Sequence, residues 1–281
     1  MIKTRALRFC MIALAGRLVP VPAARAQSTP AQDAARESVQ AIKNPFARAY
    51  VFPVISDTGR GMGPYHRTQQ TFTLQPLIPL PLGHNWDLIT QTVIPVSSQP
   101  DVALPNWRRS GLNDITVNVF AGPENDKVQW GIGASLQIPS ATNAALGAGK
   151  WCAGPAGAVF ADIGGWTVGT VVSNVKSFTG DASRPEVNFL SLQYQITHNF
   201  WRGWYMTSSP TAIADWTGAH GDRWLVPVGL GLGNVFRIGR HHVGGEFTAY
   251  YSLVHPETQP YAKWLFSLQV TFAKSRQNAT D

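Results

Sequence analysis

The chain has little charge, few cysteines and no long apolar run, and each scarcity excludes a class of protein. Charged residues are only 14% of the 281 residues and aromatic residues reach 11%, a balance that argues against an intrinsically disordered chain. With only Cys10 and Cys152, the disulfide framework of a small secreted domain is excluded. No uncharged stretch approaches the ~20 apolar residues of a membrane-spanning helix. A membrane protein of this composition has to cross the bilayer with strands.

Glycine, proline and tryptophan are plentiful, with 26, 20 and 10 residues respectively. Because Gly and Pro are poor helix formers and mark turns, this composition favours an all-β architecture. One segment is different. Residues 33–43 have the pattern of a short amphipathic helix, which Asp33 can cap and which Asn44-Pro45 ends.

Residues 1–26 resemble an export signal. Lys3, Arg5 and Arg8 give it a positive start, residues 9–15 are apolar, and residues 24–26 fit an A-x-A cleavage site. Five of the 23 Lys and Arg residues lie in this segment and no acidic residue does, so the rest of the chain has a formal net charge of only +2. The basic character of the whole chain therefore comes mainly from the export signal, and no nucleic-acid partner is expected.

The clearest strand pattern lies at residues 264–272. Five large apolar side chains share one face there: Trp264, Phe266, Leu268, Val270 and Phe272. Strict alternation with period two predicts a strand whose faces meet different environments. An apolar face with aromatic residues at both ends is typical of the lipid-facing side of a barrel strand.

Similar patterns predict twelve antiparallel strands. They lie at 49–57, 69–80, 86–96, 111–121, 128–138, 151–160, 165–175, 186–197, 203–214, 223–236, 243–254 and 262–273. Most have the about 9–11 residues that a tilted strand needs to cross a bilayer. Short and long connections alternate, as periplasmic turns and extracellular loops do in outer-membrane barrels. We therefore predict a single transmembrane β-barrel over residues 46–273, preceded by a periplasmic leader at 27–45 and followed by a polar tail at 274–281.

Aromatic residues predict where the barrel meets the membrane surface. Phenylalanines recur every 36–40 residues at the ends of descending strands, and tryptophans follow the short turns. The set is Phe120, Phe160, Phe200, Phe236, Phe272, Trp86, Trp130, Trp166 and Trp204. In a barrel all nine would lie near the periplasmic boundary as an aromatic girdle. The pattern leaves one alternative open, a hairpin repeat in a secreted soluble β protein.

Several motifs resemble those of one protein family. They include Leu146-Gly-Ala-Gly-Lys-Trp151, Gly203-Trp-Tyr-Met-Thr-Ser-Ser-Pro210, Asp222-Arg-Trp-Leu-Val-Pro227, Gly61-Met-Gly-Pro64 and Gly111-Leu-Asn-Asp-Ile115. Over about residues 44–273 the chain is similar to bacterial outer-membrane β-barrel proteins labelled "meta-pathway of phenol degradation" or transporter, some of which carry the misapplied label "neuromedin U". The resemblance implies an outer-membrane location near aromatic-compound catabolism and a transport role.

No catalytic or metal-binding signature is present in the sequence. It has no G-x-S-x-G, no H-E-x-x-H, no glycine-rich phosphate loop and no Cys pair with metal spacing. We therefore expect no enzyme, no cofactor and no metal. One alternative stays open, because some barrels hydrolyse lipids with a Ser and a His at the membrane rim. Ser208 or Ser209, with His220 and Asp222, would be the set here.

The polar strand faces predict the lining of the lumen. They are mostly neutral, which suits small neutral or weakly polar solutes better than phosphates or polyanions. Twelve strands also leave a narrower lumen than the 16–18 of general porins. The candidate pore-lining or solute-contact residues are Asp114, Gln137, Lys150, Gln193, Gln195, Asp222, Arg223 and Glu246.

The expected function is passive transport of small compounds, aromatic or hydrophobic ones among them, across the bacterial outer membrane. The expected partners are outer-membrane lipid, the barrel-insertion machinery and a small-molecule solute.

Overall fold

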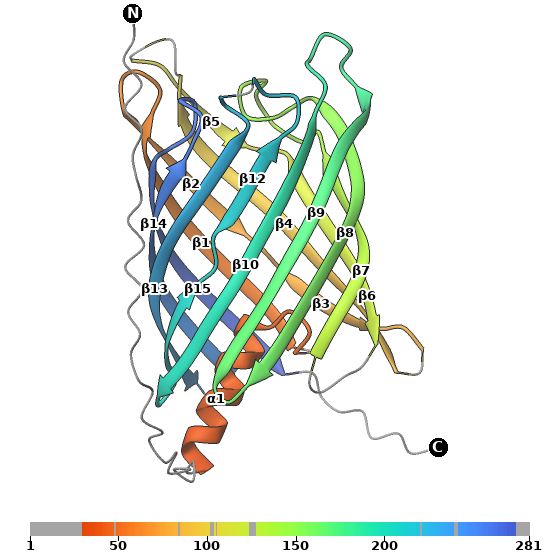
Figure 1. Cartoon of the computed structure of the whole chain (residues 1–281), viewed down its shortest axis with the longest axis vertical. Coiled ribbons are helices and arrows are strands. Elements are labelled where there is room, and N and C mark those ends of the chain that lie inside the picture. Colours follow the sequence, from red (N-terminus) through yellow and green to blue (C-terminus); the bar gives the residue numbers. More distant parts are fainter. Residues whose placement is uncertain are drawn as a thin grey trace, which may run out of the picture.

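The computed structural model describes residues 30–47, 49–83, 85–101, 104, 106–123, 128–219, 221–238 and 241–273. The predicted export signal and polar tail lie outside these ranges. The described residues form one closed antiparallel barrel with a single helix at its base (Figure 1). The twelve-stranded barrel predicted from the alternating pattern is therefore confirmed.

Helix α1 spans Pro30–Lys43 and begins three residues before the predicted helix. The strands are β1 (Ala49–Met62), β2 (Arg67–Leu74), β3 (Leu77–Pro81), β4 (Trp86–Pro100), β5 (Arg108–Leu112), β6 (Ile115–Pro123), β7 (Val128–Ile138), β8 (Lys150–Ile163), β9 (Trp166–Gly180), β10 (Asn188–Trp201), β11 (Trp204–Ser208), β12 (Thr211–Asp215), β13 (Trp224–Ile238), β14 (His241–Val254) and β15 (Ala262–Ala273). Several extend further toward their extracellular ends than the alternation predicted.

These 15 segments make twelve barrel strands because three strands are interrupted. β2 is followed by β3, β5 by β6, and β11 by β12, with two residues between the members of each pair. Two of the interruptions contain a proline, Pro76 or Pro210, which has no N–H to give to the ladder. The barrel closes where β15 pairs with β1, in a register that runs from Ala49↔Ala273 to Arg60↔Ala262.

The predicted faces of the strands are confirmed. On β15 the side chains of Trp264 and Phe266 are exposed on the outside, whereas Ser267 and Thr271 are buried on the inside. β7, β14 and residues 190–197 of β10 follow the same rule, with apolar side chains outward and polar side chains inward. Because side chains alternate strictly along a strand, one correctly placed residue determines the orientation of the others.

The predicted aromatic girdle is correct for seven residues and wrong for two. Trp86, Trp130, Trp166, Phe200, Trp204, Phe236 and Phe272 are 38–49% exposed on the outer wall. Phe120 and Phe160 are only 5% and 3% exposed and belong to a buried cluster inside the barrel. The reason is parity, since Phe120 lies two residues from Asn118, which faces the lumen.

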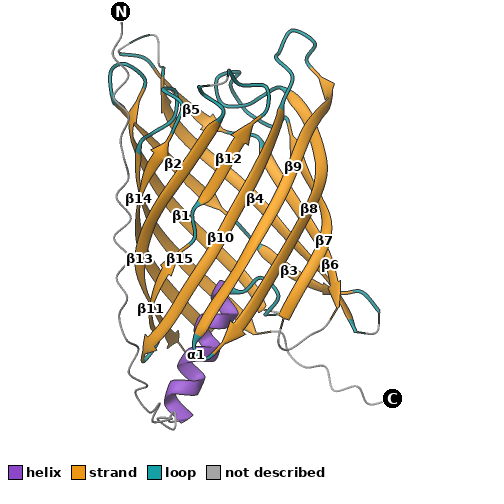
Figure 2. Cartoon of the chain, viewed as in Figure 1, coloured by secondary structure: helices purple, strands orange, loops and turns teal. Residues whose placement is uncertain are grey.

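No helix of the described residues is long and apolar enough to span a bilayer. The outer wall carries a band of exposed Val, Leu, Ile, Phe and Trp side chains. Since so much apolar surface is stable only against lipid, the barrel is a transmembrane one. Helix α1 sits at its base with one end rising between the strands (Figure 2).

Candidate functional site: the lumen and its floor

The C-terminal half of α1 packs inside the base of the barrel. Val39 and Ile42 form a buried cluster with Tyr205 of β11 and Val235 of β13. Directly after the helix, Phe46 joins a second buried cluster, where its ring lies 6.1 Å from that of Phe160. We call α1 together with residues 44–47 the plug, because residues 44–47 and the C-terminal half of the helix fill the periplasmic end of the lumen.

A buried ion pair fixes the end of the helix. Lys43 Nζ contacts Glu246 Oε2 of β14, and the two side chains are only 7% and 8% exposed. The Tyr205 hydroxyl donates to the same carboxylate over 2.9 Å, and the Thr248 hydroxyl donates to its other oxygen over 3.0 Å. A buried carboxylate needs this number of partners, because an unpaired charge at the same depth would be strongly destabilising.

Asn44 ties the plug to the opposite wall. Its amide nitrogen donates to Gln129 Oε1 over 2.6 Å and to Asp162 Oδ2 over 2.7 Å. Its amide oxygen accepts from the Phe46 backbone N–H over 3.0 Å. Gln195 of β10 donates to the Lys43 carbonyl oxygen. The plug is thus hydrogen-bonded to β7, β8, β10 and β14.

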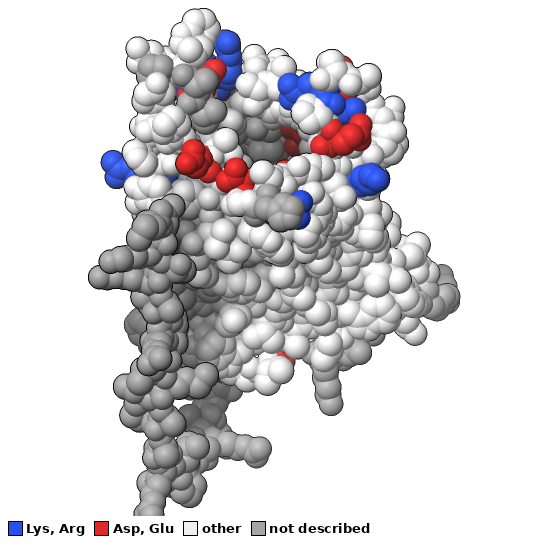
Figure 3. All heavy atoms as spheres, turned by 45° about the horizontal axis from the view of Figure 1, so that its top comes forward, with Lys and Arg blue, Asp and Glu red and all other residues white. Residues whose placement is uncertain are grey.

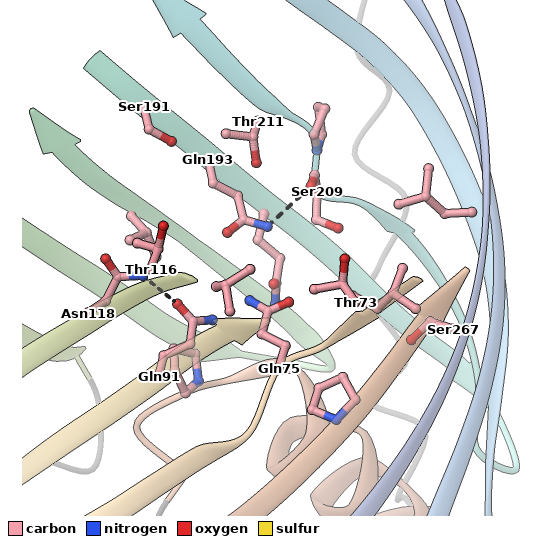
Figure 4. A pocket seen from close by; sticks show the side chains of 18 of the residues that line it. Thr73, Gln75, Gln91, Thr116, Asn118, Ser191, Gln193, Ser209, Thr211 and Ser267 are labelled. Carbon is pink, nitrogen blue, oxygen red and sulfur yellow. Dashed lines mark hydrogen bonds between the residues drawn. The ribbon is translucent and has the colours of Figure 1, made fainter. Parts of the chain in front are cut away.

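Above the plug lies a cavity of about 550 Å³ whose floor includes Ile42, Lys43 and Pro45. Its walls carry amide and hydroxyl side chains that point inward (Figure 4). Two hydrogen bonds order them: Gln193 donates to the Ser209 carbonyl oxygen over 3.3 Å, and Asn118 donates to Gln91 Oε1 over 3.1 Å. In the space-filling view the extracellular mouth is hollowed and carries both acidic and basic side chains on its rim (Figure 3).

Part of the lumen lining is apolar. Phe189 of β10 pairs with Val175 of β9, and Ile213 of β12 pairs with Leu225 of β13. All four side chains line the cavity. The lumen therefore offers both hydrogen-bonding groups and an apolar surface to a solute.

The charges in the lining neutralise one another. Apart from Lys43 and Glu246, the charged residues that line the cavity in the described part of the chain are Asp57 and Lys263. Lys263 Nζ lies 3.2 Å from Asp57 Oδ2, with side chains that are 29% and 21% exposed. The lining thus carries two ion pairs and no net charge.

Four of the eight candidate residues line the cavity: Gln137, Gln193, Gln195 and Glu246. Asp114 instead organises the loop after β7, where it accepts from the backbone N–H groups of Ala141 over 3.2 Å and Ala148 over 2.7 Å. Gln137 also donates to Asp114, over 3.1 Å.

The other three candidates belong to extracellular loops and strand ends. Lys150 forms an ion pair with Glu186 at 3.1 Å. Hydrogen bonds from the Ser177 hydroxyl and from Lys150 hold the pKa of the Glu186 carboxyl below its ordinary value. Arg223 donates to the Gly218 carbonyl oxygen over 2.9 Å, and the neighbouring Asp222 is exposed in the same turn.

Lys43, Asn44, Phe46 and Tyr205 are the important residues that sequence reasoning missed. The amphipathic pattern predicted the helix, and a helix that occludes the lumen was one possibility, but the pattern did not predict which barrel residues the helix contacts. Lys43 and Glu246 are separated by 203 positions, and no local pattern reports such a contact.

The set of residues considered for lipid hydrolysis is only partly described. The Ser208 hydroxyl donates to the Gly229 carbonyl oxygen over 2.7 Å, and Ser209 Oγ lies 3.4 Å from the Tyr250 hydroxyl oxygen. His220 lies outside the described residues. Among the residues that the structure describes, no group of three His, Cys, Asp or Glu side chains could hold a metal ion.

No family model matches the sequence, and no curated protein is similar enough to count as a match. Solved structures are similar in fold. The outer membrane channel from Pseudomonas putida F1 is 14% identical with a TM-score of 0.56, covering 80% of this chain and 95% of that chain. The NanC porin is 11% identical with a TM-score of 0.51, covering 79% of this chain and 98% of that one. Together with the apolar outer band, this fold locates the chain in a bacterial outer membrane.

Proposed function

We propose that the chain is a passive outer-membrane channel for small neutral or weakly polar compounds, aromatic and hydrophobic ones among them. The observation that carries this proposal is the lining of the lumen, where each charged side chain is paired with an opposite one and the remaining walls are amide, hydroxyl or apolar.

A lining of this kind favours neutral solutes for a physical reason. A charged solute that enters a narrow lumen loses hydration and finds no unpaired counter-charge to replace it. A neutral solute can exchange its hydrogen bonds to water for bonds to side chains such as Gln91, Gln193 and Thr211, and can rest its apolar part against Phe189 and Ile213.

The sequence motifs support a finer assignment to the family labelled "meta-pathway of phenol degradation". In that family the solutes would be aromatic compounds, which the apolar part of the lining would accommodate. The plug also belongs to the proposal. Because it forms the floor of the cavity, we infer that this conformation is the closed one and that a solute passes when the plug shifts.

Swelling of liposomes that contain the purified chain tests the proposal. Glucose, gluconate and glucosamine have nearly the same size and differ in charge. We expect glucose, and an aromatic glucoside of low membrane permeability, to enter faster than either charged sugar. Entry of none of them, or faster entry of a charged sugar, would contradict the channel proposed here.

We also propose that transport does not involve catalysis. A Ser208→Ala, Ser209→Ala double variant should keep the swelling rate of the parent chain. Release of fatty acid from phospholipid by the parent chain, lost in this variant, would favour the enzyme instead.

A further inference from the structure

In one sector of the barrel, formed by β1, β2, β4 and β5, the outer wall changes from apolar to polar toward its extracellular end. Along β1 toward its extracellular end, the outward-facing side chains are Val54, Ser56, Thr58 and then Arg60. The order is apolar, hydroxyl and finally charged. A lipid-facing strand with this order passes from the hydrocarbon into the headgroup region of the outer leaflet.

On neighbouring strands the outward-facing side chains also become polar at matching registers. Thr58 pairs with Gln70 of β2, Gln70 pairs with Ser98 of β4, and Ser98 pairs with Ser110 of β5. One step further out, Arg60 pairs with Thr68. Arg108 of β5, two residues before Ser110 in the sequence, lies on the same face as Ser110 and one step nearer the extracellular end. We call this sector the outer polar patch; it comprises Ser56, Thr58, Arg60, Thr68, Gln70, Ser98, Arg108 and Ser110.

The hydroxyl and amide groups of the patch satisfy one another. Thr58 donates to Gln70 Oε1 over 2.6 Å, and Gln70 donates to the Ser56 hydroxyl over 2.9 Å. Ser110 donates to the Ser98 hydroxyl over 3.0 Å. These bonds explain how polar groups are tolerated on a wall that otherwise faces lipid.

The two arginines are not neutralised in this way. Arg108 donates to Ser98 Oγ over 3.2 Å and to the carbonyl oxygens of Ser98 and Thr68, each over 2.9 Å, all of which are uncharged acceptors. The guanidinium of Arg60 has no hydrogen-bond or ion-pair partner among the described residues. Both side chains are exposed, so the outer polar patch presents two positive charges without a protein counter-ion.

We propose that the outer polar patch binds a phosphate-bearing headgroup of an outer-leaflet lipid, with Arg60 and Arg108 on the phosphate. The guanidinium of Arg60 can match two phosphate oxygens at once, and Nη1 of Arg108, which makes none of the bonds above, can add a further bond. Such charge-assisted bonds are about twice as strong as neutral ones. The occupant is a lipid because Val54, Phe72 and Val96 lie exposed directly below the patch, where acyl chains of the same molecule would pack.

The test uses the full chain in phosphatidylcholine nanodiscs, with bis-phosphorylated lipid A, dephosphorylated lipid A or inorganic phosphate added. Two readouts are the temperature at which the heat-sensitive folded band is lost on a gel, and the lipid retained in native mass spectrometry. The variant is Arg60→Gln with Arg108→Gln. The matched control is Arg109→Gln, since this neighbouring guanidinium lies 4.9 Å from the Trp107 ring and has the opposite parity on β5.

We expect bis-phosphorylated lipid A alone to raise the unfolding temperature of the parent chain and of Arg109→Gln. In the double variant the apparent affinity for this lipid should fall by about tenfold or more. If Arg108→Gln impairs folding, Arg60→Gln alone preserves the test, because Arg60 makes no side-chain bond within the described chain. An undiminished effect in the double variant, or an equal effect of dephosphorylated lipid A or inorganic phosphate, would overturn the proposal.

Discussion

The two ends of the lumen contain the same kind of ion pair in different surroundings. At the base, Lys43 and Glu246 are 7% and 8% exposed, and a tyrosine and a threonine add hydrogen bonds to the carboxylate. Near the mouth, Lys263 and Asp57 are 29% and 21% exposed and face the open cavity. One pair joins the plug to the barrel, whereas the other joins two neighbouring strands of the wall.

Burial determines how much each ion pair contributes to stability. Removing one partner of a buried pair leaves a desolvated charge behind and is strongly destabilising. Breaking a partly buried pair that faces a cavity has a smaller effect on stability, because water and salt partly screen the remaining charge. The Lys43–Glu246 ion pair therefore holds the plug, and the Lys263–Asp57 ion pair determines the charge that a solute meets.

The largest effect is expected from Glu246→Ala. Lys43 would remain buried without a counter-ion, and docking of the plug should weaken by about 3–5 kcal/mol. Hydrogen exchange of the backbone amides in residues 34–43 would report the change as a large loss of protection. Protection equal to that of the parent chain would show that the ion pair does not hold the plug.

Phe46→Ala should weaken docking by about 3 kcal/mol, because it leaves a cavity beside Phe160 in the buried cluster. The same exchange measurement applies. Phe200→Ala is the control, since Phe200 is exposed on the outer wall and its loss should leave the plug protected. Equal effects of the two variants would mean that general destabilisation of the barrel, and not plug packing, is being measured.

A smaller effect on stability is expected from Lys263→Gln, about 1 kcal/mol or less. Selectivity should change instead, because Asp57 would face the lumen unpaired and attract cations. Reversal potentials across a salt gradient in planar bilayers would measure this shift toward cations. A shift toward anions, or a loss of plug protection in this variant, would contradict the distinction between the two pairs.

The smallest effect concerns the loop at residues 181–187. Hydrogen bonds from Ser177 and Lys150 lower the pKa of Glu186 in the folded protein. The contribution of Glu186 to the stability of the folded loop is therefore fully present above the ordinary glutamate pKa of about 4.3. It is lost as the pH falls from there through the lowered value. Hydrogen exchange of this loop should therefore accelerate in acid in the parent chain, and much less so in Glu186→Gln.

Much of the barrel follows from the sequence because alternation is a local signal. The period-two pattern predicts which side chains of β7, β10, β14 and β15 face outward, and the structure agrees. The girdle prediction was wrong for Phe120 and Phe160 because it relied on spacing along the chain. Parity with Asn118 would have placed Phe120 inside.

The plug and the loop contacts could not be predicted in the same way. Lys43 meets Glu246 across 203 positions, and such a contact exists only once the barrel has closed around the helix. Asp114 shows a related difficulty. It lies just before β6, in the gap that separates this strand from β5, so its carboxylate bonds backbone N–H groups of a loop and not the lumen.

We propose that this barrel is a channel whose floor is the plug. Single-channel conductance in planar bilayers tests it most directly, with the parent chain, Glu246→Ala and Lys263→Gln compared under the same conditions. We predict a higher open probability or conductance for Glu246→Ala, and for Lys263→Gln an altered ion preference without additional opening. No conductance from any of the three proteins, or an increase confined to Lys263→Gln, would contradict this account.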